Sequence, residues 1–256
     1  MKTLTRILPL LFTFLIAPLC ASASEDSAKA KEIVRAAVDY WRDKSSYTAS
    51  EMQVKRPTWE REMKMVGWTK GMKKSLIRFT EPAKDAGNAS LTINEDIWSY
   101  TPKVNRVIRI PASMKSQSWM GSDFSYRDLA RSDEIVEDYT HKILETKQVD
   151  GHNVYVVEMV PHDSAPVVWG KEVLDVREDY VMLKHQFFDQ DMKLVKVLET
   201  KEIRNLGGKL YPAVMRMSNV EKPEEWTEIR TIEAEFGAPV PDSTFTLSNL
   251  RNPRAR

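Results

Sequence analysis

The spacing of apolar residues predicts one long helix near the start of the chain. Between residues 27 and 44 apolar side chains recur every three or four positions, as on one face of a helix. These side chains are Ala30, Ile33, Val34, Ala37, Val38 and Trp41. Asp26 or Ser27 can cap the start of this helix, and Arg42 and Lys44 suit its negative end. Its apolar stripe must pack on another element.

From Tyr47 onward, short segments rich in β-branched and aromatic residues alternate with turn residues, which predicts a series of strands. The predicted strands are residues 48–56, 59–69, 72–80, 89–94, 96–101, 104–110, 137–149, 153–161, 171–178, 180–189, 193–205, 209–219 and 226–236. Asp150-Gly151 and Gly207-Gly208 favour two-residue turns, and residues 189–192 favour a third short turn. Strands joined this tightly are antiparallel, and the pattern contains no alternating strand and helix units of a doubly wound sheet.

Several predicted strands are apolar on both faces. In residues 153–161 one face holds Val154, Val156 and Val160, and the other holds Tyr155, Val157 and Met159. In residues 210–218 one face holds Leu210 and Val214, and the other holds Tyr211, Ala213, Met215 and Met217. A sheet with one wet face would alternate apolar and polar residues, so this sheet is predicted to be covered on both sides. One helix is little cover, and we expect the sheet to curl over its concave side.

The remaining cover is predicted to come from the middle of the chain. The stretch SWMGSDFSYRDL, residues 118–129 and hereafter the central segment, places Trp119, Met120 and Phe124 around Gly121. Gly121 permits a sharp turn, and Ser122 or Asp123 can cap a short helix running toward Leu129. The segment is therefore predicted to be a helical or looped plug over the mouth of the curved sheet, although these side chains could equally complete an ordinary core.

The methionines add candidates for a cavity lining. The chain has 12 methionines, and Met63 with Met65 and Met215 with Met217 lie two residues apart, so each pair shares one face of its strand. Flexible thioether chains suit a cavity that accepts irregular apolar ligands, and they also serve as gap fillers in a core. The sequence leaves both roles open.

The first 23 residues are predicted to be a cleaved signal peptide. Lys2 and Arg6 lead into a short, proline-interrupted apolar run, which ends near the small-residue motif Ala21-Ser22-Ala23. The run is too short to suit a transmembrane helix. The alternative is lipid attachment at Cys20, which Leu19 disfavours because a small residue usually precedes a lipidated cysteine. We therefore expect export, with cleavage near Ala23.

Cleavage would leave residues 24–256, which have no Gly/Ser linker and are predicted to form a single domain. Cys20 is the only cysteine, so the mature chain would have neither disulfides nor cysteine-bound metals. Removal of Lys2 and Arg6 from the 38 basic residues leaves 36 against 37 acidic residues. This near-neutral, interspersed charge gives no basis for a nucleic-acid partner or for stable attachment to anionic lipid.

The sequence contains no recognisable reaction centre. The four histidines, at 141, 152, 162 and 185, have no metal-ligand spacing, and His185 follows Val181 and Leu183 on one predicted strand face, as a core residue would. The acidic residues at 189 and 191 and at 221, 224 and 225 favour solvated turns over a cation site. We therefore predict no catalytic residue, no metal and no cofactor. Convergence of separated residues into a hydrolase site is the least favoured alternative.

Three stretches resemble the LolA-like family of periplasmic outer-membrane lipoprotein-sorting proteins. The first is RFTEPAKDAGNASLTINEDIWSYTPKVNRVIRI, residues 78–110. The second is the central segment, which is similar to the most distinctive stretch of one branch of the family. The third is PVPDSTFTLSNL, residues 239–250, in which Phe245 is expected to close the sheet. The resemblance extends from the predicted helix to about residue 250.

The resemblance implies a mainly β fold with helices (α+β). The fold is an incomplete antiparallel β-barrel, a strongly curved sheet with helices covering its concave face. It also implies a monomeric periplasmic carrier without a cofactor. Such a carrier binds lipid or lipoprotein acyl chains in a hydrophobic cavity and moves them between the inner and outer membranes. The implied partners are an ABC or RND transporter of the inner membrane and an acceptor in the outer membrane. The alternative is a lipid- or peptide-sensing module of the same fold that controls a membrane partner.

The expected lipid-binding cavity and lid consist of Trp59, Met63, Met65, Phe79, Trp98, Trp119, Met120, Phe124, Tyr211, Met215 and Met217. The arginine that holds the lid in the best-known carriers has no clear equivalent, and Lys70 is the nearest candidate. If the central segment is a movable lid, Trp119→Ala would alter cargo binding and leave the thermal midpoint nearly unchanged. If Trp119 is a core residue, the same change would cost several kcal/mol of stability.

Overall fold

A computed structural model describes residues 19–129 and 133–253, with side chains from residue 25 onward. Thirteen strands match the predicted ones, with ends that differ by up to four residues. The strands are β1 Ser45–Arg56, β2 Trp59–Lys70, β3 Lys74–Glu81, β4 Ala89–Ile93, β5 Asp96–Thr101, β6 Arg106–Arg109, β7 Tyr139–Val149, β8 His152–Pro161, β9 Lys171–Arg177, β10 Met182–Phe188, β11 Leu194–Leu206, β12 Lys209–Asn219 and β13 Lys222–Phe236. The predicted signal peptide lies mostly outside the described residues.

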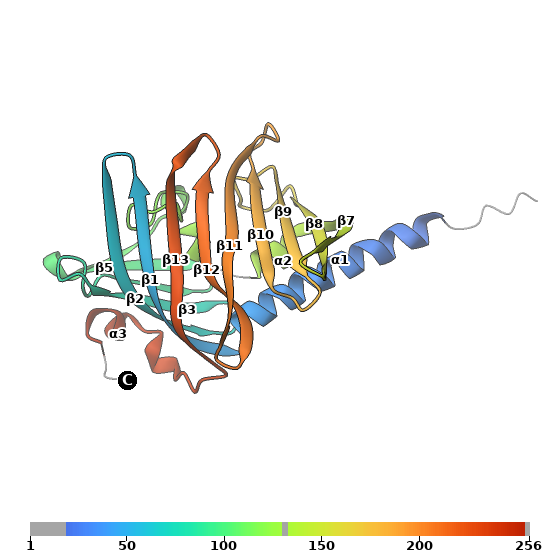
Figure 1. Cartoon of the computed structure of the whole chain (residues 1–256). Coiled ribbons are helices and arrows are strands. Elements are labelled where there is room, and N and C mark those ends of the chain that lie inside the picture. Colours follow the sequence, from blue (N-terminus) through green and yellow to red (C-terminus); the bar gives the residue numbers. More distant parts are fainter. Residues whose placement is uncertain (1–18, 130–132, 254–256) are drawn as a thin grey trace, which may run out of the picture.

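All thirteen strands belong to one antiparallel sheet, in the order β6-β5-β4-β3-β2-β1-β13-β12-β11-β10-β9-β8-β7. Every neighbouring pair is consecutive in sequence except β1 with β13, which joins the two meanders. The sheet curves strongly (Figure 1). It does not close, because β6 and β7 remain its edges. The predicted incomplete β-barrel is confirmed.

The helices are few and mostly short. They are α1 Leu19–Arg42, α2 Glu134–Glu137 and α3 Leu247–Arg251, with 3-10 turns η1 Pro102–Val104, η2 Ala112–Met114, η3 Arg127–Leu129 and η4 Asp242–Thr244. Within the described ranges, no helix combines the length and apolar character needed to cross a bilayer. The cover over the sheet therefore depends on α1 and on irregular segments.

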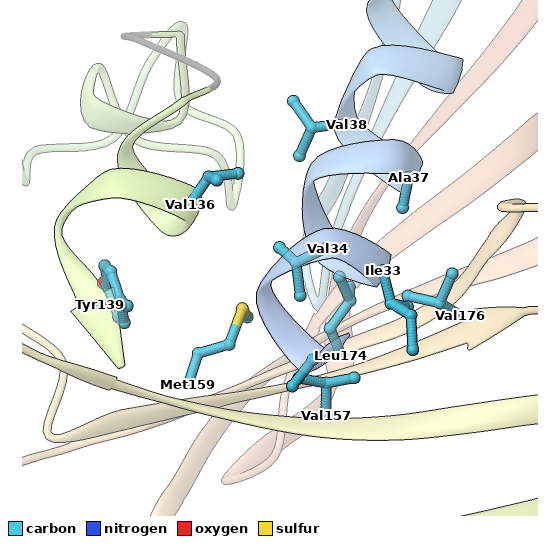
Figure 2. Close-up of a cluster of buried hydrophobic side chains, with 11 residues drawn as sticks. Ile33, Val34, Ala37, Val38, Val136, Tyr139, Val157, Met159, Leu174 and Val176 are labelled. Atoms are coloured by element: carbon cyan, nitrogen blue, oxygen red, sulfur yellow. The ribbon is translucent and has the colours of Figure 1, made fainter. Parts of the chain in front are cut away.

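Helix α1 covers the half of the sheet that ends in β7. Its apolar stripe, including Ile33, Val34 and Ala37, packs on strands β8 and β9 and faces α2 across Tyr139 and Met159 (Figure 2). These side chains form one buried cluster, as the periodicity predicts. The stripe fixes α1 against the concave face because its removal from water is favourable.

The start of α1 differs from the prediction. The helix begins at Leu19 rather than near Ser27, and Asp26 lies inside it instead of capping it. Residues 19–26 contain no proline or glycine, the residues that interrupt a helix most strongly, so the helix continues through the predicted cap positions. The predicted cap residues therefore have no terminus to cap.

The C-terminal tail covers the outer face of the other half of the sheet. Phe245 and Leu250 are buried against Leu76, Leu91 and Tyr100 of strands β3 to β5. The Arg78 guanidinium donates to the Leu250 carbonyl at 3.1 Å and holds the tail in place. The expectation that Phe245 closes the sheet is wrong, because Phe245 lies outside the strands and packs on the outer face of β3 to β5.

Candidate functional site

The central segment begins with a tight turn, and its helical part is the single 3-10 turn η3 at Arg127–Leu129. Met120 and Gly121 have φ angles of 55° and 75°, and the Ser122 N–H donates to the Trp119 carbonyl at 3.0 Å. Two successive positive φ angles are the geometry of a type I′ turn. The predicted sharp turn at Gly121 is confirmed. The predicted helix from Ser122 is wrong, because the turn continues into a short antiparallel bridge between Ser118 and Ser125.

Trp119 is a core residue. Its side chain is only 1% exposed and packs on Phe79 with ring centroids 5.3 Å apart. Its indole N–H donates to the Ser90 hydroxyl at 3.0 Å. A side chain that is buried and hydrogen-bonded in this way cannot leave without exposing the core, so the expectation that Trp119→Ala spares the thermal midpoint does not fit the structure.

Polar contacts anchor the same turn to the hairpin tips. The Asp123 carboxylate accepts from Arg56 at 3.0 Å and from the Thr227 hydroxyl at 2.6 Å. The Asp123 carbonyl accepts from Lys196 at 2.7 Å. Strands β1, β13 and β11 therefore all bind this turn. In the structure the central segment is anchored as a wall over the concave face.

A cavity of about 340 Å³ lies beneath this wall. It is bounded by the C-terminal end of α1, by β1 to β3, by the central segment and by strands β9 to β13. Its apolar lining includes Val38, Trp41, Met65, Trp68, Ile77, Trp119, Phe124, Trp169, Phe187, Leu198, Tyr211, Met215, Met217 and Ile229. The concave face of the sheet, the end of α1 and the central segment thus surround a space with mainly apolar walls.

Six of the eleven residues expected in the cavity and lid line this space. They are Met65, Trp119, Phe124, Tyr211, Met215 and Met217. Met63 and Phe79 are buried in the cluster that surrounds Trp119, and Met120 is partly buried against it. Trp98 packs in the outer-face cluster with Leu91, and Trp59 is 46% exposed at the β1–β2 tip. Lys70, the candidate for holding the lid, pairs with Asp242 of the tail at 3.2 Å.

One wall of the cavity carries a polar network that the sequence pattern does not predict. Glu172 of β9 is 2% exposed, and the Tyr139 hydroxyl donates to its Oε1 at 2.5 Å. The His185 Nε2 lies 2.5 Å from the Glu172 Oε2. Beside them, Arg127 donates to Glu134 at 2.9 Å. His185 was expected in a core, and the only sequence signal for Glu172 is its place on the apolar strand face of Leu174 and Val176.

Burial shifts the pKa values of this network. The pKa of Glu134 is raised by burial, which outweighs the effect of Arg127, and the neighbouring Asp138 and Glu172 raise it further. Burial and the Glu172 carboxylate raise the pKa of the Tyr139 phenol. Both shifts show that this wall disfavours additional negative charge.

Arg42 occupies the other end of the cavity. It is 7% exposed and donates to the Gly71 carbonyl at 2.9 and 3.1 Å and to the Lys74 carbonyl at 2.9 Å. Burial lowers its pKa to about 10, so it stays charged at neutral pH. These contacts fasten the end of α1 to the β2–β3 turn and use the guanidinium for structure.

The described residues contain no group of three or more His, Cys, Asp or Glu side chains placed to hold a metal ion. What the arrangement offers chemically is a partly open, mainly apolar cavity with one polar wall.

Comparisons with known proteins agree with this geometry. A family model described as an uncharacterized protein matches residues 71–252. A domain provisionally described as an outer membrane lipoprotein-sorting protein, from Vibrio parahaemolyticus, superposes with a TM-score of 0.78 at 26% identity. That match covers 88% of this chain and 99% of the other. No curated protein matches the sequence.

Two further solved structures share the fold. A DUF1329 family protein from Desulfovibrio piger has a TM-score of 0.79 at 24% identity, with 88% of this chain and 99% of the other covered. A LolA superfamily protein from Nitrosomonas europaea has a TM-score of 0.71 at 24% identity, with 86% and 98% covered. At these identities the likeness establishes the fold.

Proposed function

We infer a function from the family and the fold of this chain. The chain belongs to the family whose model, described as an uncharacterized protein, matches residues 71–252. Its fold is LolA-like, as in the outer membrane lipoprotein-sorting domain from Vibrio parahaemolyticus. The predicted resemblance is thereby confirmed. We propose that the protein is a carrier without catalytic activity that holds lipid or lipoprotein acyl chains in its cavity. We further propose that it is exported to the periplasm as a single domain of residues 24–256 after cleavage near Ala23.

The observation that supports the proposal is the cavity of about 340 Å³, lined by apolar side chains from the concave face of the sheet. An acyl chain in water gains roughly 25 cal/mol for each Å² of apolar surface that it buries. A few hundred Å² therefore supply several kcal/mol, which is enough for capture and remains reversible. The proposed contacts are the six predicted residues that line the cavity, together with Trp169, Phe187 and Leu198.

A carrier of this kind needs partners at both membranes. We propose an inner-membrane transporter of the ABC or RND type as the source of cargo and an outer-membrane acceptor as its destination. This assignment rests on the lipoprotein-sorting description of the relative from Vibrio parahaemolyticus and on the fold.

Displacement of a fluorescent fatty-acid probe from the purified protein tests acyl binding. Met215 is 9% exposed and lines the cavity, whereas Leu210 of the same strand is 43% exposed and lies outside the lining. A buried carboxylate in an apolar cavity costs at least a few kcal/mol, so Met215→Glu is expected to weaken probe binding by about tenfold or more. Leu210→Glu is the matched control and should bind as the wild type does. A wild-type protein that binds no acyl probe at micromolar concentrations would contradict the proposal.

A further inference from the structure

The guanidinium of Arg42 has no carboxylate partner. Arg42 lines the cavity and is 7% exposed. The described residues include every Asp and Glu of the chain, and none of them forms an ion pair with Arg42. Burial lowers the pKa of Arg42 and Asp133 raises it, but Asp133 pairs with Lys73 at 3.9 Å. A buried charge without a partner of opposite sign is costly, so a negative ligand group would stabilise this end of the cavity.

The other Arg and Lys side chains of the cavity lining are already paired. Arg127 donates to Glu134 at 2.9 Å, and Lys184 pairs with Glu199 at 3.5 Å. Arg42 uses its Nε and Nη2 atoms for backbone carbonyls of the β2–β3 turn, and its Nη1 atom donates to no group of the described residues. Each terminal nitrogen of a guanidinium carries N–H donors, so those on Nη1 are available to a ligand.

Three hydroxyl residues lie in a row next to the contacts of Arg42. In the sheet register Ser46 of β1 lies opposite Thr69 of β2, and Thr69 lies opposite Ser75 of β3. All three line the cavity, and Ser75 directly follows Lys74, whose carbonyl accepts from Arg42. The Ser46 and Thr69 hydroxyls hydrogen-bond to each other at 2.7 Å. These three residues, hereafter the hydroxyl row, bring hydroxyl donors to the same end of the cavity as the guanidinium.

The Ser75 hydroxyl is buried and makes no hydrogen bond within the described residues. Its side chain lines the cavity and is 8% exposed. Buried hydroxyls are normally hydrogen-bonded, because a buried donor without an acceptor costs free energy. A ligand oxygen that accepts from Ser75 would remove that cost. Hydrogen bonds from guanidinium and hydroxyl groups to an ionised oxygen are about twice as strong as those between neutral groups. The chemistry that suits this end of the cavity is therefore an oxyanion.

We propose that Arg42 and the hydroxyl row form a subsite for the carboxylate or phosphate oxygens of an acidic amphiphile. The acyl chain of the same molecule lies against the apolar lining of the cavity. The oxyanion accepts hydrogen bonds from the Arg42 Nη1 atom and from the Ser75 hydroxyl. This inference rests on the proposed acyl-carrier function and names the class of cargo, which is an acyl chain with a negatively charged end.

Competition between amphiphiles of one chain length tests the subsite on the wild-type protein. Dodecanoate is expected to displace the fluorescent fatty-acid probe at least about tenfold more strongly than dodecanol, which has the same chain and no charge. Dodecyl phosphate should compete as strongly as dodecanoate. Dodecyltrimethylammonium should compete less strongly than dodecanol, because Arg42 repels it. Inorganic phosphate and acetate, which have no long chain, should compete only at far higher concentrations.

Variants locate the selectivity. Arg42→Gln should remove most of the preference for dodecanoate and leave dodecanol binding intact. If Arg42→Gln fails to fold, Ser75→Ala provides the second test. Its missing hydroxyl has no partner in the protein, so the thermal midpoint of ligand-free Ser75→Ala should be unchanged or higher, while its dodecanoate binding should weaken several-fold. Lys74→Gln is the matched control, because the Lys74 side chain pairs with Asp242 at 2.9 Å outside the cavity lining. It should keep the wild-type preference.

The outcomes separate the two proposals. If no acyl probe binds and no amphiphile competes, the carrier function itself is refuted. If dodecanol or the ammonium amphiphile competes as strongly as dodecanoate, acyl binding stands and the oxyanion subsite is refuted. If inorganic phosphate competes as strongly as dodecyl phosphate, the site binds a free anion and the amphiphile subsite is refuted. A full preference for dodecanoate in both Ser75→Ala and folded Arg42→Gln would also overturn the subsite.

Discussion

Replacement of Trp119 by alanine is expected to destabilise the protein strongly. The indole is 1% exposed, and buried Trp→Ala changes remove about 3–5 kcal/mol. The change also leaves the Ser90 hydroxyl, now 3.0 Å from the indole nitrogen, without its donor in a residue that is 5% exposed. That loss adds about 1 kcal/mol. The expected decrease in the free energy of unfolding is therefore about 4 kcal/mol or more.

Urea denaturation followed by far-UV circular dichroism measures this decrease. For a domain of this size each kcal/mol lowers the thermal midpoint by roughly 2–4 °C, so the midpoint should fall by about 8–16 °C. Trp119→Phe keeps a ring against Phe79 and loses the N–H donor, so it should cost about 1–2 kcal/mol. Trp59→Ala is the control at a tryptophan that is 46% exposed, and it should stay within about 0.5 kcal/mol of the wild type.

A loss below about 1 kcal/mol for Trp119→Ala, together with altered acyl binding, would refute this reasoning. Such a result would mean that the side chain leaves its site without exposing the core. The central segment would then be a movable lid, as the sequence allowed, and its anchoring by Arg56 and Asp123 would have to be weak.

Two further changes test the contributions of His141 and Arg42, two buried residues, to stability. Burial lowers the pKa of His141, so the folded state binds fewer protons than the unfolded state below about pH 6.5. The stability that His141 contributes is therefore present above that pH and is lost as the pH falls. In the wild type the free energy of unfolding should decline between about pH 8 and pH 5, and in His141→Gln this decline should be smaller. Arg42→Ala should lower the free energy of unfolding by about 3 kcal/mol in urea denaturation, because it leaves the Gly71 and Lys74 carbonyls without donors. Arg42→Lys should restore little of the lost free energy of unfolding, because an ammonium cannot reproduce the planar donor geometry of the guanidinium. Stability equal to that of the wild type in Arg42→Lys would contradict this account.

The sheet could be predicted from the sequence because its signals are local. Short turns such as Gly207-Gly208, with φ angles of 55° and 86°, fix each hairpin and make consecutive strands antiparallel. The strands predicted to be apolar on both faces are β8 and β12, whereas the tail covers the outer face of β3 to β5, and Leu210 on the outer face of β12 is 43% exposed. What covers the outer face could not be predicted, because the burial of Phe245 against Leu91 depends on contacts between residues far apart in sequence.

The placement of single side chains was less predictable than the strands. Met215 and Met217 share a face of β12, and both line the cavity, because strand alternation fixes their direction. Trp59 has the same alternation as Met63, yet it lies beyond the cavity at a hairpin tip and is exposed. Alternation along a strand predicts which face of the sheet a side chain lies on. Whether that side chain reaches the cavity also depends on where the sheet bends.

The charged residues on inner strand faces are the positions where the sequence pattern and the cavity differ most. Glu172 interrupts an apolar strand face that continues through Leu174 and Val176, and it is nevertheless buried. Its two partners come from β7 and β10, so no local pattern reveals that Tyr139 and His185 meet it. A buried carboxylate costs free energy unless other groups stabilise it. Here the Tyr139 hydroxyl and the His185 imidazole each lie 2.5 Å from one of its oxygens, so the burial of Glu172 depends on contacts between strands that are far apart in sequence.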